Sequence, residues 1–457
     1  MRIAINTLLL SEPDTGSGQY IAHLLRAFAA REDDNEYVLL AGTPLSSVNS
    51  PLLAAGLRPA ANAGWHTPRE HGRAGSRTAS HGRPLAGGAY GNAPYDFPAR
   101  EGGELTSPDR GGAGGEVRFH SLAIRSPLHG RHAGLDKVWW EQISFPRACA
   151  RLRADVAHVP YFASALWPRL PTVVTVLDLI PLILPEYRTS VLVRLYTALA
   201  VRSVRRATRL IAISGWSKRD AVRLLKVPEE RVHVVYLAAD ERFRPVTDPA
   251  ALADLRARHG LGERFVFYLG GFDARKDVAT LIRAFAAARA GLPGWQLVIA
   301  GGLRPHSALF PDPRPVAREL GLRIVEAPAC DPGADVVFPG RISEADKPLF
   351  YAAAGVFAFP SRYEGFGLDP LEALACGVPV VCSDATALPE VVGDAALLVS
   401  PGDVPGFAAA IIRAATDDAL RAELRARGPL QAARFSWSRA AAETLAVYRE
   451  AAQEPVT

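Results

Sequence analysis

The sequence has few cysteines, and their spacing excludes the usual cysteine-based frameworks. Its 457 residues include four cysteines, and no two of them form a CxxC pair. That spacing supports neither a zinc site nor a set of disulfides, so we expect reduced thiols in the cytosol.

Long apolar runs are also missing. No segment approaches the roughly 18 continuous apolar residues that a membrane-spanning helix needs. The N-terminal stretch "MRIAINTLLL" has a short apolar run without a clear cleavage site, so we expect a first strand there rather than a signal peptide. Both absences favour a cytoplasmic location.

The composition is that of a soluble globular protein of two or three domains. Hydrophobic residues make up 49% of the chain and charged residues 22%. The net charge is +5, which favours anionic partners such as nucleotides, phosphates or membrane surfaces without choosing among them.

Two separate βαβ patterns predict two doubly wound α/β domains. The first starts at "RIAIN", continues through a loop with Gly16 and Gly18 into a helical repeat, and reaches "YVLLAG". The second runs from "RFVFYLGG" to "QLVIAGG". Its helix has an apolar repeat at i, i+3, i+4 and i+7, formed by Val278, Leu281, Ile282 and Phe285.

These patterns predict a first domain over 1–242, a second over 243–435 and a C-terminal amphipathic helix over 436–457. That helix is able to cover either domain, including by crossing back to the first. Between about 61 and 115 lie thirteen glycines, with Leu85 and Leu105 as the only Ile, Leu or Val residues. We expect a flexible insertion there, with a small structured subdomain as the alternative.

The stretch "RYEGFGLDPLEALACG" holds two glutamates eight positions apart, Glu364 and Glu372. It follows the apolar strand "VFAFPS" and so lies at a strand's carboxyl end, where open α/β sheets bind ligands. One interpretation is purely structural: Asp369 caps a helix, Pro370 starts it, Glu372 completes a capping box and Gly377 ends it.

The other interpretation of this stretch is a ligand site. A helix N-terminus offers free N–H groups and a partial positive charge, which suit a phosphate. Gly365 and Gly367 allow the backbone to approach a ligand closely. Carboxylates accept hydrogen bonds from vicinal hydroxyls, and a nucleotide sugar supplies such hydroxyls on both sides of a diphosphate.

Here a family resemblance enters. "EGFGLDPLEA" resembles the E-x7-E motif of the retaining GT-B glycosyltransferases, the GT4-like glycosyl transferases group 1 family. "YLGGFDARKDVATLIRAFA" is similar to the phosphate-binding turn of that family, and "DVVFPGRISEADKPLFYAAAGVFAFPS" and "ACGVPVVCSDATALPEVVGDAALLVSPGD" also follow its pattern. The resemblance covers nearly the whole chain apart from the insertion. It implies a GT-B fold, with two Rossmann-like domains facing a central cleft.

The resemblance also implies roles for residues of the second domain. Glu372 would hold the ribose of the donor, and Glu364 would hold hydroxyls of the transferred sugar. Lys276, helped by Arg275, would neutralise the departing diphosphate. Without the resemblance, Lys276 would be taken for a solvated residue near a helix start. Further donor contacts would come from Gly271, Ile342, Gly365, Phe366, Gly367 and Leu368.

In the first domain the candidates are less specific. Gly16 and Gly18 match the family loop that approaches acceptor or donor phosphate, although a tight turn explains them equally well. His158 is either a core or turn histidine or a cleft residue. Asp178 is a catalytic candidate, or a turn or cap residue. The chain departs from the family at Gly271, where arginine is frequent, and at Leu177, where many members have histidine.

The sequence contains no D-x-D triplet of the kind that binds a diphosphate through a metal. We therefore expect metal-independent catalysis by Lys276 and Arg275, with no cofactor. The expected reaction is retaining transfer of a sugar, with mannose favoured by resemblance, from a nucleoside diphosphate sugar to a hydroxyl of a carbohydrate or lipid-linked acceptor. It would serve cell-surface polysaccharide or glycolipid synthesis. The alternatives are a non-catalytic nucleotide-sugar-binding protein and a sugar-nucleotide epimerase, and no nucleic-acid partner is expected.

Arginines cluster in "RTSVLVRLYTALAVRSVRRATR", which contains no acidic residue. On a helix, Arg194, Arg202, Arg205, Arg206 and Arg209 fall on one face, with Arg188 at its edge. One interpretation is a solvated basic face. The other is docking on anionic lipid at the inner membrane face or on a phosphate-bearing acceptor.

Overall fold

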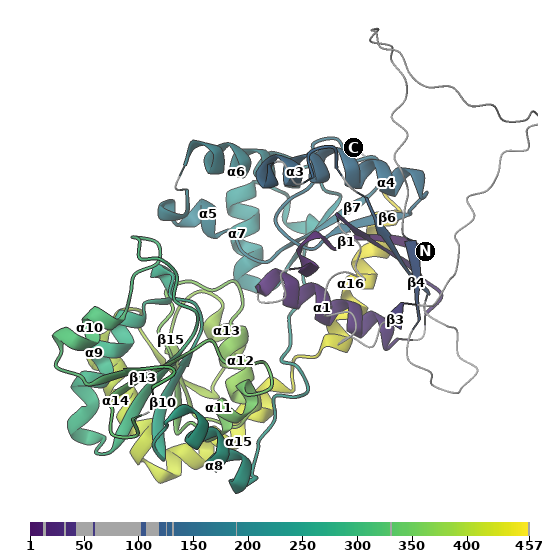
Figure 1. Cartoon of the computed structure of the whole chain (residues 1–457). Coiled ribbons are helices and arrows are strands. Elements are labelled where there is room, and N and C mark those ends of the chain that lie inside the picture. The colour runs from purple at the N-terminus through teal and green to yellow at the C-terminus, as the bar shows by residue number, and fades with distance from the viewer. Residues whose placement is uncertain are drawn as a thin grey trace, which may run out of the picture.

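The computed structural model describes residues 1–11, 15–31, 33–42, 118–124, 126–129, 132–188, 190–329 and 331–455, together with two short strands at 58–59 and 102–106. These residues form two α/β domains, each built on its own sheet with helices packed on the faces (Figure 1). The fold class expected from the two βαβ patterns is confirmed.

The first sheet has nine strands within the described part of the chain, in the order β3-β4-β5-β2-β1-β6-β7-β8-β9. The strands from β5 to β9 pair in parallel, and β3 and β4 pair antiparallel at one edge. The strands are β1 (Arg2–Asn6), β2 (Glu36–Ala41), β3 (Arg58–Pro59), β4 (Gly102–Thr106), β5 (Arg118–Ala123), β6 (Val156–Val159), β7 (Thr172–Val176), β8 (Arg209–Ala212) and β9 (Val232–Val234).

Strand β4 falls inside the expected insertion. The rest of 61–115 lies outside the described residues. Gly102–Thr106 pairs antiparallel with β5, with Gly103 opposite Ser121, and so extends the first sheet at its edge. These five residues of the segment expected to be a flexible insertion form backbone pairs, although the segment has few aliphatic side chains.

The helices and helical turns of the first domain connect these strands. They are η1 (Leu8–Ser11), α1 (Gly16–Ala29), α3 (Ala133–Trp139), η3 (Trp140–Ser144), α4 (Phe145–Arg151), α5 (Ile180–Ile183), η4 (Pro185–Tyr187), α6 (Val191–Val204), α7 (Gly215–Leu225) and η5 (Glu229–Arg231). Gly16 and Gly18 do not form the expected loop. They lie in the first turn of α1, where the Thr15 side chain accepts a hydrogen bond from Gly18 N.

The second sheet has seven parallel strands in the order β12-β13-β11-β10-β14-β15-β16. The five inner strands are almost completely buried, as expected for a parallel sheet covered on both faces, while the edge strands β12 and β16 are only partly buried. The strands are β10 (Arg264–Leu269), β11 (Trp295–Ala300), β12 (Ile324–Glu326), β13 (Val336–Gly340), β14 (Val356–Phe359), β15 (Val380–Ser383) and β16 (Ala396–Val399).

The helices of the second domain include the predicted one at 278–285. All four apolar residues of that repeat are buried in α9, which confirms it. The helices and helical turns are α8 (Pro249–His259), η6 (Ala274–Lys276), α9 (Val278–Ala288), η7 (Arg289–Gly291), α10 (Arg314–Glu319), α11 (Lys347–Ala353), α12 (Leu368–Ala375), α13 (Leu388–Val392), α14 (Val404–Thr416) and α15 (Asp418–Ala432).

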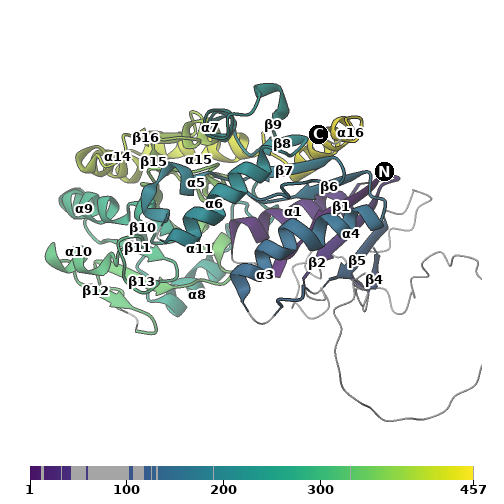
Figure 2. The same cartoon turned by 90° about the horizontal axis from the view of Figure 1, so that it is seen from above.

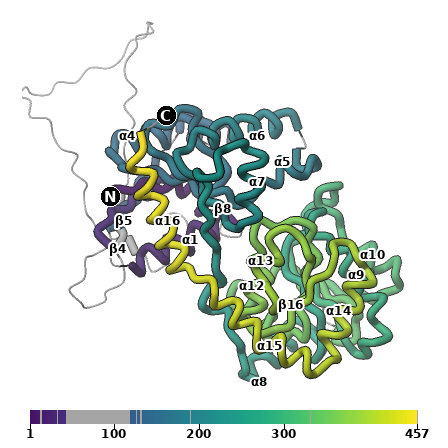
Figure 3. The backbone as a smooth tube through the Cα atoms, turned by 180° about the vertical axis from the view of Figure 1, so that it is seen from behind, coloured from purple at the N-terminus to yellow at the C-terminus, as the bar shows by residue number. Residues whose placement is uncertain are grey.

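The last helix, α16 (Trp437–Ala452), leaves the second domain and packs on the first (Figure 3). It contacts α1 and strands β6, β7 and β8. Its fully buried Tyr448 packs against the Phe28 ring and forms a 2.7 Å hydrogen bond with Nδ1 of His158. The C-terminal residues thus complete the core of the domain that begins the chain.

We predict that this buried contact stabilises the first domain. Tyr448→Phe leaves the polar nitrogen of His158 without its partner and should lower the free energy of unfolding by about 1–3 kcal/mol. Tyr448→Ala adds a cavity and should cost about 3–5 kcal/mol. Denaturant unfolding followed by circular dichroism measures both. The exposed Arg449→Ala on the same helix is the control and should change stability by less than about 0.5 kcal/mol. A Tyr448→Phe variant as stable as the control would contradict the prediction.

Candidate functional site

The order of the second sheet marks where a ligand site is expected. Strands β11, β13 and β12 lie in that order on one side of β10, while β14, β15 and β16, which come later in the chain, lie on the other side. The side on which the chain adds new strands therefore changes between β10 and β14, and these two strands are themselves parallel neighbours. In open α/β sheets, ligands bind at the carboxyl ends of the strands at this switch point. The loops that leave these two ends carry Lys276 and Glu364.

Glu364 is the centre of the polar contacts between these loops. Its Oε1 lies 2.9 Å from Lys276 Nζ and 2.7 Å from Arg275 Nη1, and the Ser361 hydroxyl donates to it at 2.7 Å. Its own N–H donates to Thr386 Oγ1. Burial alone would raise the pKa of this carboxyl, but the positive charges of Arg275 and Lys276 outweigh burial and lower the pKa to about 2. Glu364 is therefore an anion at every physiological pH.

Lys276 lies among acidic and aromatic partners and is 7% exposed. Besides Glu364 it reaches Asp369 Oδ2 at 3.5 Å, and its ammonium stands 4.5 Å from the centre of the Phe359 ring. The alternative of a solvated surface lysine is therefore wrong. Asp369 was not expected here as a charged partner. The clue in the sequence was its position between the two glutamates.

The capping-box interpretation of Glu372 is also wrong. Helix α12 starts at Leu368, its N-cap is Gly367 with φ = 121°, and no side chain caps it. Asp369 therefore lies inside the first turn and Glu372 in the second turn, too far along to reach the N-cap amide. The expected C-terminal stop does hold, since Gly377 has φ = 71° directly after the C-cap.

The uncapped start of α12 leaves backbone donors free. Among the described residues, no hydrogen-bond acceptor pairs with the N–H groups of Phe366, Gly367 or Leu368. These amides belong to the loop that holds Glu364, whose carboxylate contacts Lys276. Free amides, a partial positive charge at the helix start and a buried cation together can bind a phosphate.

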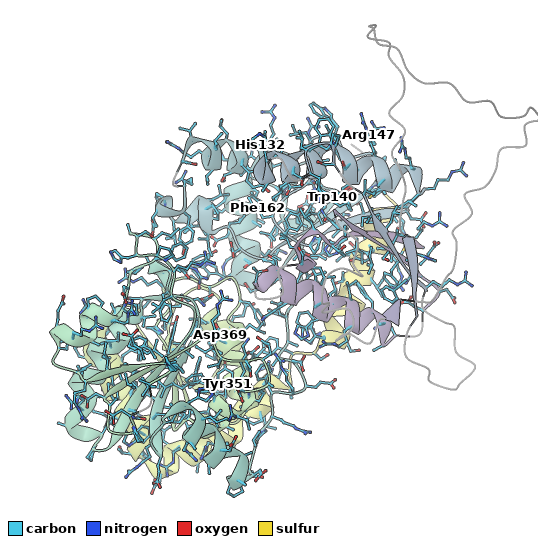
Figure 4. The ribbon with its side chains drawn as sticks, in the orientation of Figure 1. His132, Trp140, Arg147, Phe162, Tyr351 and Asp369 are labelled. Atoms are coloured by element: carbon cyan, nitrogen blue, oxygen red, sulfur yellow. The ribbon has the colours of Figure 1, made fainter. Side chains whose placement is uncertain are left out.

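Glu372 lies in an environment opposite to that of Glu364. It is 7% exposed, and the Tyr351 hydroxyl donates to its Oε2 at 3.3 Å. Burial raises the pKa of Glu372 to about 8, and the negative charge of Asp369 acts in the same direction. Figure 4 shows Tyr351 and Asp369 close to one another in the second domain. Without a bound partner, Glu372 is mostly protonated at pH 7.

The first domain contributes the loop after β7. A Cβ on Gly365 would overlap the carbonyl oxygen of Leu177, so only glycine permits this approach between the domains. Asp178 follows, and its Oδ1 accepts from Ile180 N at 3.2 Å, which supports the turn interpretation. Burial raises the pKa of Asp178 against the opposing charge of Arg275. The Leu177 side chain packs on the core rather than projecting freely.

Sequence reasoning missed a set of contacts that join the domains at α7. The hydroxyls of Ser214 and Ser217 donate to Gly365 O at 2.7 and 2.8 Å. The carboxylate of Glu390 accepts from the N–H of Gly215 at 2.8 Å and from the Tyr236 hydroxyl at 2.6 Å. The serines alone carry no recognisable motif. Their role depends on where the second domain lies.

The remaining candidates occupy varied positions. Gly271 is exposed after β10, and its carbonyl accepts from the Tyr268 hydroxyl at 2.7 Å. Ile342 is half-buried just after β13. His158 is fully buried, with Nε2 2.8 Å from Thr175 Oγ1 and Nδ1 bonded to Tyr448, and burial lowers its pKa to about 3. Of the two interpretations of His158, the structure therefore supports the core residue and not the cleft residue.

Two further features of the described part of the chain concern metals and membranes. There, no three His, Cys, Asp or Glu side chains gather as a metal site would require. Within the same residues, no helix combines the length and the apolar content needed to cross a bilayer.

The chain has two α/β domains with the candidate site at the switch point of the second sheet, which is the architecture of the GT-B fold. It belongs to the glycosyl transferases group 1 family. Residues 254–431 match the model of that family, "Glycosyl transferases group 1", and residues 104–243 match "Glycosyltransferase Family 4". The resemblance seen in the E-x7-E stretch is thereby confirmed.

Curated relatives include several mannosyltransferases. The chain is 32% identical over 265 residues to O-antigen chain mannosyltransferase B of Escherichia coli, covering 58% of this chain and 66% of that protein. It is 30% identical over 337 residues to the serotype-specific mannosyltransferase WbdA of Escherichia coli, covering 71% and 40%. It is 32% identical over 257 residues to the MMP alpha-(1->4)-mannosyltransferase of Mycolicibacterium hassiacum, covering 55% and 56%. The chain thus spans 40% to 66% of these relatives.

Solved structures share the fold along nearly the whole chain. Sucrose-phosphate synthase from Thermosynechococcus elongatus superposes with a TM-score of 0.63 at 20% identity, covering 98% of both chains. HepE from Anabaena, solved with UDP-glucose, gives a TM-score of 0.61 at 18% identity, covering 98% of this chain and 99% of that one. These likenesses establish the architecture.

We predict that Gly365→Ala separates the two domains. Its Cβ would overlap backbone that cannot move aside without displacing the loop after β7. We expect a larger radius of gyration by small-angle scattering, with each domain still folded by circular dichroism. Gly134→Ala is the matched control, because a Cβ there meets no atom within 4 Å. Identical scattering from both variants would show that the interdomain contact tolerates the methyl group.

We also predict that Glu372 reduces stability at neutral pH. Its folded pKa of about 8 exceeds the ordinary value of 4.5, so the unfolded state loses its proton first. Stability should therefore fall as pH rises from about 4.5 to 8. Glu372→Gln should remove that slope and stabilise the protein at pH 8 by at least about 1.4 kcal/mol, the value of one pKa unit. Melting temperatures between pH 4 and 9 test this, with the exposed Glu319→Gln as control. Parallel curves for Glu372→Gln and the unmodified protein would contradict it.

Proposed function

We propose that the chain transfers mannose from a nucleoside diphosphate mannose to a hydroxyl of a carbohydrate or lipid-linked acceptor, with retention of the anomeric configuration. The observation that carries this proposal is the meeting of two cations with an uncapped helix N-terminus at the switch point. A diphosphate leaving group needs such an arrangement, because negative charge grows on it in the transition state.

The donor would lie along α12. Its diphosphate would accept hydrogen bonds from the amides of Phe366, Gly367 and Leu368 and face Lys276. Glu364 would accept hydrogen bonds from sugar hydroxyls with the carboxylate oxygen that the cations leave available. Glu372 would do the same for the ribose, and bringing hydroxyl donors to this carboxylate favours its ionised form.

In the proposed reaction the bond from the anomeric carbon to the phosphate oxygen breaks, and a bond from that carbon to the acceptor oxygen forms on the same face. The acceptor's proton passes to the departing phosphate oxygen, so no side-chain base is required. Leu177, which can neither take nor give a proton, is compatible with this route. Asp178, beside the contact between the domains, would orient the acceptor hydroxyl.

Two comparisons support the choice of substrates. Three of the relatives named above are mannosyltransferases, and two of those are named for O-antigen or serotype. We therefore place the activity in cell-surface polysaccharide or glycolipid synthesis. The HepE structure with UDP-glucose supports a nucleotide sugar as donor. We propose that Lys276 and Arg275 do the work of a metal at the diphosphate.

The test is a panel of nucleotide sugars, including GDP-mannose and UDP-glucose, incubated with the purified protein and assayed for nucleoside diphosphate release. We expect a mannose donor to be consumed, at a rate unchanged by a chelator, to give a product of unchanged anomeric configuration by NMR. Lys276→Met should lower kcat by about 10²–10³-fold. The control, Lys218→Met, removes a partly exposed lysine that pairs with the exposed Glu229, and should retain activity. An epimerised donor, or donor binding without release or transfer, would overturn the assignment.

A further inference from the structure

Exposed apolar side chains concentrate on one surface of the first domain. Nine large hydrophobic residues of the described chain are exposed, and five of them come from α3, the loop before β7, and α6. These five side chains are 57–79% exposed. They are Leu135, Trp167, Val191, Leu192 and Leu195. Such clustering on a folded domain marks an interaction site rather than the usual scatter of single residues.

Hydrogen bonds show that these three segments are neighbours. The Tyr196 hydroxyl of α6 donates to Glu141 of η3, directly after α3. Gln142 of η3 in turn bonds to Ser164 O and Leu166 N in the loop before β7. Figure 2 looks onto this side of the molecule, where α3, α4, α5 and α6 lie toward the viewer.

An arginine-lined pocket of about 510 Å³ lies on the same surface, between η4 and α6. The four arginines that line it are Arg188, Arg194, Arg202 and Arg205. Within the described chain, Arg188, Arg194 and Arg202 form no ion pair. The side chain of Arg205 donates only to the carbonyl of Leu225. Glu186 is exposed two positions before Arg188. Its single negative charge does not balance the four arginines, and the net charge of the pocket remains positive. We call these arginines and the five apolar residues the docking face.

The structure corrects the arginine set expected from the sequence. Arg209 belongs to β8 rather than to α6, and its side chain is 17% exposed. It pairs with Glu450 of α16 and with Glu454, just after the end of that helix. Arg206 follows the end of α6 and does not line the pocket. The basic residues of the docking face thus gather at the side of α6 that faces η4.

We propose that the docking face binds the surface of an anionic lipid bilayer. The interpretation as a solvated basic face explains the arginines but not the exposed leucines and tryptophan beside them. A bilayer surface offers a partner to both kinds of side chain. Leu192, Leu195 and Trp167 would enter the region between headgroups and acyl chains, and the arginines would contact lipid phosphates. Charge complementarity selects anionic over neutral lipid.

The docking face adjoins the cleft. Tyr187, the residue before Arg188, donates its hydroxyl to Asp273 of the second domain at 2.5 Å. Asp273 in turn pairs with Arg275 at the centre of the candidate site. Docking would therefore hold one side of the site near the membrane surface, where a lipid-linked acceptor would be found.

Vesicle sedimentation without donor or acceptor tests the proposal independently of any activity. The unmodified protein should bind vesicles of phosphatidylcholine with 30% phosphatidylglycerol and not vesicles of phosphatidylcholine alone. Binding should weaken with added salt. The double variant R194Q/R202Q should bind about 30-fold more weakly, from about 1 kcal/mol per arginine. Leu192→Ser with Leu195→Ser should weaken binding at least several-fold.

Matched controls come from the second domain. R264Q/R283Q removes two exposed arginines, and Leu430→Ser removes an exposed leucine, and neither should change vesicle binding. Equal binding to neutral and anionic vesicles would overturn the proposal. So would vesicle binding that inorganic pyrophosphate abolishes at low millimolar concentration while the leucine variant binds normally, since that result identifies a soluble phosphate site instead.

Discussion

The buried pairing of Glu364 with Arg275 and Lys276 is the interaction on which the candidate site depends. Removing charges from water costs several kcal/mol for each ion, so the group persists only because every charge finds partners. Glu364 has them in both cations and in Ser361. The pairing fastens the loop after β10 to the loop after β14, and Arg362 N reinforces it by donating to Arg275 O at 2.7 Å. Both carboxyl ends at the switch point are thereby held as one unit.

The same loop also joins the two domains. Directly after Glu364, Gly365 lies against Leu177 on one side, and its carbonyl accepts from Ser214 and Ser217 on the other. The next residues supply the free amides at the start of α12. A donor that binds these amides therefore touches a segment already shared with the first domain. In the proposed function, donor binding and the relative position of the domains would be coupled through this short piece of backbone.

The sequence predicted what depends on local pattern and missed what depends on tertiary position. Apolar periodicity located α9 and both sheets, and the spacing of Glu364 and Glu372 pointed to the loop that carries the candidate site. The error about Glu372 arose because α12 starts at Leu368, so that Asp369 pairs with Lys276 instead of capping the helix. The core position of His158 and the pairing of Arg209 could not be read locally, because Tyr448 lies 290 residues after His158 and Glu454 lies 245 residues after Arg209. Both partners lie in or just after α16, which returns to the first domain. No window of sequence contains both ends of such a contact.

The two glutamates of the E-x7-E stretch differ in charge, and the difference suits the proposed chemistry. Arg275 and Lys276 carry two positive charges, and Glu364 compensates one of them permanently because its pKa is about 2. Asp273 and Asp369 also contact these cations, at 3.0 Å from Arg275 Nε and 3.5 Å from Lys276 Nζ, and burial raises the pKa of Asp369. The free amides and the partial positive charge at the uncapped start of α12 therefore lie beside these paired cations, where a departing diphosphate would gain charge. Glu372, with a pKa of about 8, adds little negative charge until hydroxyl donors reach it. One carboxylate thus organises the cations, while the other stays nearly neutral beside them and does not weaken the phosphate site.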